Sequence, residues 1–187
     1  IMNKLLAFGA SSSKNSRNKK LASYVANRMD PKEAIIVDLN EFEMPIYSED
    51  REQEIGVPDK AYEFKKLVNE SIGIIISLAE HNGSYTSAFK NIYDWISVIE
   101  KTVWCNKPLI LLSTSDGQNA GRTVLKTALS RFSRQSKQEI PHFSLPRFNE
   151  NFSDTDGITD KKLIEDLDIQ ISIFSRQVDD LLNSSNN

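Results

Sequence analysis

Cysteine is nearly absent from this chain: Cys105 is the one cysteine among its 187 residues. A single cysteine cannot form an intrachain disulfide, and it cannot build a Cys-rich zinc site. Such usage is typical of proteins from a reducing compartment, so we expect a cytoplasmic location.

Long apolar runs are also lacking. The longest, Ile72–Ala79, is far shorter than the roughly 20 residues that a membrane-spanning helix needs. The first apolar stretch is too short for a signal peptide and leads directly into a polar loop. We therefore expect no membrane partner.

The charge balance is close to neutral, with a formal net charge of -3. Nucleic-acid binding usually needs a basic surface, so we expect no nucleic-acid partner. Nor is the balance as acidic as in a dedicated electron carrier that steers to basic partners. Hydrophobic residues at 39% and charged residues at 26% are typical of a globular protein. The length favours one domain over residues 1–187, with residues 183–187 as a polar tail.

Short apolar runs alternate with segments of helical periodicity. The runs predict strands at Lys4–Phe8, Ala34–Leu39, Ile72–Ala79, Pro108–Ser113 and Glu139–Leu145. The periodic segments predict helices at Ser16–Arg28, Asp59–Asn69, Ser84–Ile99, Ala120–Phe132 and Asp160–Leu182. Residues 40–58 are acidic, contain proline and are expected to form a loop. Continuous apolar runs suit strands buried on both faces of a parallel sheet. The alternation predicts a flavodoxin-like three-layer α/β/α sandwich with a five-stranded parallel sheet of order 2-1-3-4-5.

In such a sheet, ligands bind beyond the carboxyl ends of the strands, where the strand order reverses. The loop after the first strand, residues 9–18, is rich in hydroxyl groups and leads into a helix. Free backbone N–H groups and the helix dipole favour an anion there, which suggests a phosphate cradle. The alternative is a serine-rich turn in which Ser16 or Asn15 caps the helix.

Several competing sites are excluded by this first loop. It contains no Gly-Lys-Ser/Thr, so it is not a Walker A loop, and no G-x-G-x-x-G dinucleotide fingerprint. No pair of aspartates follows the first strand to hold Mg²⁺, and no G-x-S-x-G elbow marks a hydrolase nucleophile.

The loops after the third and fourth strands are also small and polar. In the first of them, Asn82 and Gly83 could lie along a flat heterocycle. The alternative is an Asn-Gly turn followed by Ser84 as a helix cap. His81 has no Asp or Ser arrangement that would make it a catalytic base. The other loop, residues 113–121, could wrap the opposite side of the same ligand or simply cap a helix.

Together, these loops resemble motifs of the NADPH-dependent FMN reductase family, which includes small azo-, quinone- and chromate-reducing flavoproteins. The family's first loop, glycine-serine-x-arginine-x-x-serine-x-asparagine, corresponds here to Ala10-Ser11-Ser12-Ser13-Lys14-Asn15-Ser16-Arg17-Asn18. Its second motif corresponds to Ala79-Glu80-His81-Asn82-Gly83-Ser84, followed by Lys90-Asn91-Ile92-Tyr93-Asp94-Trp95. Segments 107–121 and 154–163 are also similar, so the resemblance covers nearly the whole chain.

The resemblance implies FMN as cofactor and NADPH or NADH as co-substrate. It also implies a small-molecule electron acceptor and a homodimer or homotetramer. It assigns the FMN phosphate to Ser11, Ser13, Ser16 and Asn18. It assigns the isoalloxazine ring to Glu80, His81, Asn82 and Gly83, with Ser84 nearby. It places Ser113, Ser115 and Gly117 near the ribityl chain and ring.

Four positions depart from the family pattern. Ala10 replaces a glycine, His81 a tyrosine and Asp116 a proline. Ser13 stands where arginine is usual, which removes a cation that Lys14 and Arg17 could partly replace. Two alternatives to a reductase stay open: a non-catalytic flavin-binding or electron-transfer protein, and a flavodoxin-like module with an empty site.

Overall fold

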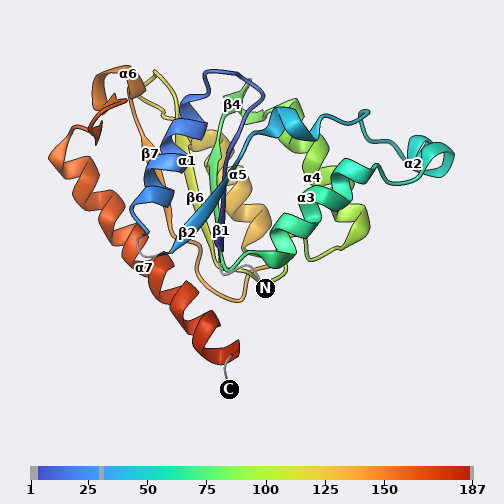
Figure 1. The fold of residues 1–187 in the computed structure, drawn as a ribbon. Coiled ribbons are helices and arrows are strands. Elements are labelled where there is room, and N and C mark those ends of the chain that lie inside the picture. Colours follow the sequence, from blue (N-terminus) through green and yellow to red (C-terminus); the bar gives the residue numbers. More distant parts are fainter. Residues whose placement is uncertain (1–3, 30–31, 186–187) are drawn as a thin grey trace.

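The computed structural model describes residues 4–29 and 32–185. At its centre is one parallel sheet in the order β2-β1-β3-β6-β7 (Figure 1). Its strands are β1 (Lys4–Ala10), β2 (Glu33–Val37), β3 (Ile74–Leu78), β6 (Leu109–Thr114) and β7 (His142–Leu145). Counted along these strands, this is the predicted order 2-1-3-4-5, so the flavodoxin-like fold is confirmed.

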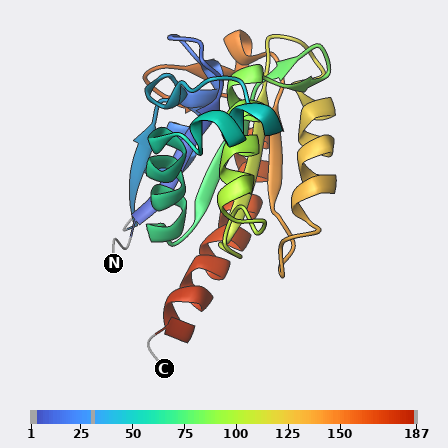
Figure 2. The same ribbon diagram turned by 90° about the vertical axis from the view of Figure 1, so that its right-hand side faces the viewer.

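Helices cover both faces of the sheet, because right-handed crossovers between parallel strands place them there (Figures 1 and 2). One face carries α1 (Arg17–Asn27) and α7 (Lys161–Ser185). The other carries α3 (Asp59–Glu70), α4 (Ser87–Ile99) and α5 (Arg122–Phe132). The three layers that the sequence predicted are therefore present.

The central strands β1, β3 and β6 are largely apolar because each face of the sheet packs on a helical layer there. In β1, Leu6 and Phe8 belong to the core cluster of α3, α4 and α5, whereas Leu5 and Ala7 belong to that of α1 and α7. All four side chains are buried. The continuous apolar runs of the central strands thus reflect burial on both faces, whereas the edge strand β2 leaves Glu33 and Ile36 exposed.

Residues 40–58 contain helix where the sequence predicted a loop. A 3₁₀ turn, η1 (Leu39–Phe42), is followed by α2 (Glu49–Ile55). Ser48 caps α2 by accepting a hydrogen bond from the backbone N–H of Arg51, and Gly56 ends it at a positive φ of 73°. Three acidic residues in the first turn complement the helix dipole. No residue of α2 is buried, and the helix stands off from the rest of the fold (Figure 1).

The start of α4 also differs from the prediction. A hairpin of β4 (Glu80–His81) and β5 (Ser84–Tyr85) precedes it, so the helix begins at Ser87 and not at Ser84. Its cap is Thr86 and not Ser84. The Thr86 hydroxyl accepts from the Phe89 N–H at 3.2 Å and donates to the Ala10 carbonyl at 2.9 Å. This bond fixes α4 to the carboxyl end of β1.

A short segment links β7 to the last helix. It comprises α6 (Phe148–Asn151) and a hairpin of β8 (Phe152–Ser153) and β9 (Gly157–Ile158). Helix α7 then runs to Ser185, so residues 183–185 are helical and not part of a tail, and residues 186–187 lie outside the described residues. Within the described residues, no helix combines the length and apolar character that crossing a membrane requires.

Candidate functional site

A pocket of about 320 Å³ lies at the carboxyl ends of β1, β3 and β6, where the strand order reverses. The loops after these three strands form its walls. Its lining residues are Ser11, Ser13, Asn15, Ser16, Arg17, Asn18, Ala79, Glu80, His81, Thr114, Ser115 and Asp116. Two neighbouring hollows of about 500 and 400 Å³ are larger, but each is bounded by a single one of these loops and by elements further out. The pocket at the strand ends is therefore the candidate site.

The first wall is the loop between β1 and α1. Ser16 caps α1, and its hydroxyl accepts from the Lys19 N–H at 3.1 Å. The backbone N–H groups of Arg17 and Asn18 belong to the first turn, where a helix supplies no acceptor of its own. These N–H groups and the positive end of the helix dipole favour an anion at this wall.

Gly9 allows α1 to approach β1 closely enough to form this wall. A Cβ at this position would lie 2.3 Å from the Lys19 backbone nitrogen and 2.7 Å from the Asn18 carbonyl carbon. Both are backbone atoms, so they could move away only if the helix itself moved. The sequence interpretation did not single out Gly9, although a glycine that closes a buried strand before a helix is a signal for close approach.

Asn18, which was predicted to hold a phosphate, lines the pocket, but its side chain bonds to other parts of the protein. Its amide oxygen accepts from the Ser77 hydroxyl at 2.8 Å and from the Thr114 N–H at 3.2 Å. Its amide nitrogen donates to the Thr114 carbonyl at 3.3 Å. Asn18 is only 5% exposed. The side chain therefore joins α1 to β3 and β6, and both ends of its amide group already have partners there.

The second wall is the β4–β5 hairpin. Asn82 and Gly83 occupy its two turn positions with φ values of 51° and 75°, which suits a type I′ turn. The Asn-Gly turn is thus present. Its tip is exposed, and Asn82, Gly83 and Ser84 lie outside the residues that line the pocket. His81 and Glu80, at the base of the hairpin, do line it.

Glu80 connects this hairpin to the start of α5. Its carboxylate accepts from the Val124 N–H at 2.9 Å. The N-cap residue that precedes α5 is Gly121, at a φ of 71°, and it has no side chain to cap the helix. The Glu80 carboxylate supplies the missing acceptor and places a negative charge at the positive end of the helix dipole.

The third wall, Thr114–Asp116, comprises the last residue of β6 and the start of the loop after it. Ser115 lines the pocket, but Ser113 does not. The Ser113 hydroxyl is fully buried, donates to the Ala120 carbonyl at 2.7 Å and lies 2.8 Å from the Ser144 hydroxyl. Gly117 also lies outside the lining, and its carbonyl accepts from the Ala120 and Arg147 N–H groups at 3.3 Å. Ser113 therefore positions this loop through its buried hydrogen bonds and not by lining the pocket.

The structure thus brings seven of the twelve predicted site residues into the pocket lining: Ser11, Ser13, Ser16, Asn18, Glu80, His81 and Ser115. The prediction missed five other lining residues: Asn15, Arg17, Ala79, Thr114 and Asp116. All five lie in the same three loops or at the ends of the strand and helix that adjoin them. Treating each loop as a continuous wall, and not as a set of motif positions, would have included them.

One ion pair joins the first wall to the third. The Arg17 guanidinium lies 2.5 Å from the Asp116 carboxylate, and both side chains are 45% exposed. Among the residues lining the pocket, Arg17 is the one lysine or arginine, whereas Glu80 and Asp116 both carry carboxylates.

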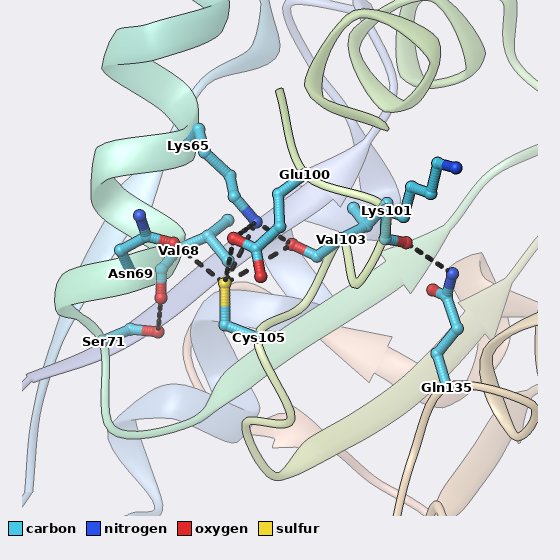
Figure 3. Close-up of polar contacts among 9 residues, drawn as sticks. All are labelled: Lys65, Val68, Asn69, Ser71, Glu100, Lys101, Val103, Cys105 and Gln135. Carbon is cyan, nitrogen blue, oxygen red and sulfur yellow. Dashed lines mark hydrogen bonds and ion pairs between the residues drawn. The ribbon is translucent and has the colours of Figure 1, made fainter. Parts of the chain in front are cut away.

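A second polar cluster lies near the amino end of β6, at the opposite edge of the sheet (Figure 3). The buried Lys65 amine donates to the Val103 carbonyl at 2.7 Å and to the Cys105 thiol at 3.0 Å. It also lies 3.0 Å from the Glu100 carboxylate. The thiol in turn donates to the Asn69 side-chain oxygen at 2.9 Å.

The electrostatics of this cluster indicate that its role is structural: it holds residues 100–105 in place. The hydrogen bond from Lys65 lowers the pKa of Glu100, whereas burial raises the pKa of the Cys105 thiol. A thiol with a raised pKa is a poor nucleophile near neutral pH. The cluster holds residues 100–105 against α3, and the backbone of Cys105 adopts a positive φ of 54° there.

Comparison with known proteins decides the family. The sequence pattern of the NADPH-dependent FMN reductase family matches residues 3–150. The chain belongs to this family. The resemblance in the loop motifs is thereby confirmed.

Curated relatives of this FMN reductase family member include quinone-reducing enzymes. The chain is 30% identical over 105 residues to a 2-hydroxy-1,4-benzoquinone reductase from a Burkholderia species, which covers 56% of each chain. It is 28% identical over 79 residues to a quinone reductase of Escherichia coli K12, which covers 42% of each. The chain thus spans about half the length of the curated relatives it matches.

Solved structures with the same fold cover nearly the whole chain. FerB, a flavoenzyme NAD(P)H:(acceptor) oxidoreductase from Paracoccus denitrificans, aligns with a TM-score of 0.73 and 20% identity, over 95% of this chain and 98% of that one. An FMN-dependent NADH-azoreductase from Bacillus anthracis, in complex with FMN, aligns with a TM-score of 0.62 and 12% identity, over 96% and 99%. At these identities the likeness is one of fold.

Asn18→Ala tests the structural role of that side chain. We expect a loss of about 2 kcal/mol in the free energy of unfolding, because the substitution leaves buried groups of Ser77 and Thr114 without a partner. Urea denaturation measures the change. The matched control is Asn15→Ala, an exposed neighbour in the same loop that should change stability little. Equal effects of the two substitutions would contradict this role.

Lys65→Met tests whether the polar cluster at the amino end of β6 stabilises the fold. It should lower the free energy of unfolding by about 1–3 kcal/mol near neutral pH, because it removes buried hydrogen bonds. Since Lys65 lowers the folded-state pKa of Glu100 below 4.5, the stability from that pair is present above pH 4.5 and is lost as pH falls through the folded-state value. The penalty of the variant should therefore shrink in acid.

The control for this variant is the neighbouring Lys66→Met. The Lys66 side chain is 72% exposed and lies 3.8 Å from Glu70, so its removal should cost little. Denaturation of both variants across a pH series gives the comparison. A Lys65→Met penalty that equals that of Lys66→Met, or that does not change with pH, would refute the assignment.

Proposed function

We propose that residues 1–187 form a single domain that holds FMN in the pocket at the strand ends. In this proposal the protein passes electrons from NADPH or NADH to a small acceptor such as a quinone, azo compound, flavin or metal oxyanion. The observation that carries the proposal is the convergence of three polar loops and one helix N-terminus on a single pocket. Family membership supports the same conclusion.

The donor set at the first wall suits the phosphate of FMN. Ser11, Ser13 and Ser16 bring hydroxyl groups to the pocket, and the first turn of α1 brings backbone N–H groups. A phosphate at a helix N-terminus gains both hydrogen bonds and a favourable dipole. The pocket volume of about 320 Å³ lies at the lower end of the range of about 300–1,000 Å³ for ligand sites.

The other two walls suit the ring and ribityl ends. Glu80 and His81 line the pocket on one side and Ser115 on the other. We assign the exposed hairpin tip, Asn82–Gly83 with Ser84, to the edge of the isoalloxazine ring, where its backbone is accessible. Gly117 keeps its proposed place near the ring, in the exposed part of the third loop. Ser113 serves this end by positioning the loop and not by contact.

The chain's own residues bind and orient in this mechanism. The chemistry that bound FMN supplies is hydride transfer from the nicotinamide and delivery of the electrons to the acceptor. No side-chain nucleophile or general base is needed, which agrees with a pocket that contains one histidine and no cysteine. Oriented backbone N–H groups at the hairpin are suited to stabilise negative charge at the ring edge. The names of the quinone- and azo-reducing relatives support a small, flat acceptor.

The FMN site is tested by Ser13→Asp. A carboxylate at this position should repel the phosphate and weaken FMN binding by at least about tenfold, while riboflavin, which lacks the phosphate, should bind unchanged. Ser12→Asp is the matched control, because the adjacent Ser12 lines the neighbouring hollow and not the pocket. Quenching of flavin fluorescence measures each affinity. Equal losses in both variants would place the phosphate elsewhere.

The reductase activity is tested in the same preparation. We expect anaerobic addition of NADPH or NADH to bleach the absorbance of the bound flavin, and a quinone to restore it. FMN that binds but is not bleached would overturn the reductase and leave a flavin-binding or electron-transfer protein. A colourless protein that takes up no FMN would leave a flavodoxin-like module with an empty site.

We also propose that the protein acts as a homodimer or homotetramer in the cytoplasm. No residue of α2 is buried, and the side chains of Ile46 and Ile55, at either end of this segment, are 75% and 57% exposed. A helix that stands off from the fold with apolar residues at both ends is typical of a segment covered by a partner. The single cysteine supports a reducing compartment.

Light scattering after size exclusion tests this assembly. The wild type should elute as a dimer or tetramer, and combined Ile46→Asp and Ile55→Asp substitutions should produce monomer, because they place charges in the interface. Ile169→Asp is the control, since Ile169 is 59% exposed on α7, on the other face of the sheet. A monomeric wild type would exclude the proposed assembly, and an unchanged assembly state in the double variant would exclude this interface.

A further inference from the structure

We propose that Arg17 is the cation that holds the FMN phosphate in this chain, and that Asp116 competes with the phosphate for it. The ion pair across the pocket would then determine how strongly FMN is retained. The inference rests on the proposed function, because it requires FMN in this pocket. It concerns two residues that the family motifs do not assign to the cofactor.

Among the residues that line the pocket, Arg17 is the one with a cationic lysine or arginine side chain. It occupies the first position of α1, beside the N–H groups that suit a phosphate. Lys14 lines the neighbouring hollow on the other side of the loop. Lys19 and Lys20 line that hollow too, and they are paired with Asp38 and Asp154 at 2.7 Å.

Ser13 makes a substitute necessary, since it stands where the family usually has an arginine. The Ser13 side chain brings a hydroxyl and no charge, and its backbone N–H is bonded to the Ser11 hydroxyl at 3.1 Å. A guanidinium binds phosphate through two parallel charge-assisted hydrogen bonds, which a hydroxyl cannot match. Arg17, four residues later and on the same wall, can provide them.

The side chains that line the pocket carry more negative than positive charge, which disfavours a phosphate. A phosphate can pair with Arg17 only if the guanidinium separates from Asp116. Arg17 contributes one positive charge, and Asp116 and Glu80 contribute two negative ones. Glu80 is held at the N-terminus of α5 by the Val124 N–H, so it has a partner of its own. Asp116 instead holds Arg17. A phosphate group carries a charge of about -1.5 to -2 at neutral pH, so it competes directly with Asp116 for the guanidinium.

The exposure of the pair makes this exchange feasible. Both side chains are 45% exposed, and exposed ion pairs contribute little to stability. A phosphate at the helix N-terminus offers Arg17 more negative charge than a carboxylate does, and the backbone N–H groups nearby also donate to that phosphate. Arg17 can therefore leave Asp116 without loss of the fold, while Asp116 still reduces the gain from binding FMN.

Flavin binding to the purified full-length chain tests the inference, with FMN and riboflavin as paired probes. Arg17→Gln should weaken FMN binding about tenfold, the loss expected for a charge-assisted hydrogen bond. Asp116→Asn should tighten FMN binding by about three- to fivefold, the range of an exposed ion pair. Riboflavin affinity should stay unchanged in both variants, because riboflavin has no phosphate. Fluorescence quenching gives the dissociation constants without any measurement of activity.

Asp154→Asn is the matched control. It removes the same charge and also frees a cation of α1, Lys20, but that cation lines the neighbouring hollow. FMN affinity should therefore stay unchanged. The double variant Arg17→Gln, Asp116→Asn separates competition from simple repulsion. With Arg17 absent, the gain from Asp116→Asn should largely disappear if Asp116 acts by holding Arg17.

The outcomes are distinct. Failure of the wild type and of every variant to bind FMN would overturn the proposed function, and the inference with it. Two results would overturn only the inference. One is an FMN affinity that Arg17→Gln leaves unchanged, and the other is an FMN affinity that Asp116→Asn does not increase. An equal gain from Asp116→Asn with and without Arg17, or an equal gain from Asp154→Asn, would also overturn it.

Discussion

The hydrogen bonds of one buried amide, that of Asn18, hold together the strand ends on which the candidate site depends. They join the first turn of α1 to Ser77 in β3 and to Thr114 in β6. Gly9 lets α1 come close enough to make them. Because the helix cannot shift without breaking these bonds, its N-terminal N–H groups stay fixed over the pocket. The donor groups that we propose for an anion are therefore placed by the fold itself, before any ligand binds.

The other walls are positioned by the same kind of polar side chain. Glu80 fastens the hairpin to the N-terminus of α5, and Ser113 fastens the loop after β6 to Ala120. Thr86 fastens α4 to the end of β1. Several residues of the family motifs therefore act on the shape of the pocket, while the groups that we propose to contact a ligand are hydroxyls, backbone N–H groups and Arg17. A motif in a sequence does not distinguish these two roles, because both require a fixed residue type at a fixed place.

The sheet and its order could be predicted from the sequence because buried strands and amphipathic helices have different periods. The Asn82–Gly83 turn could be predicted as one reading of its loop, since few residue pairs adopt two positive φ angles. Helix α2 could not, because it buries no residue and so has no apolar period; it depends on the cap at Ser48 and the acidic first turn. Thr86 was missed as a cap because the strand pairing of Ser84 takes precedence over its capping preference.

The site was harder to predict than the fold for a related reason. Whether a polar residue meets a ligand depends on which way its side chain turns, and burial of Asn18 and Ser113 turned both of them inward. Arg17 and Asp116 come together only because the loops after β1 and β6, nearly a hundred residues apart, end at the same edge of the sheet. No local pattern contains that pairing. Two departures from the family pattern both reduce the positive charge available in the pocket. Ser13 replaces an arginine and so removes one cation, and Asp116 replaces a proline and pairs with another cation, Arg17. In the proposed site, affinity for FMN therefore depends on both loops together.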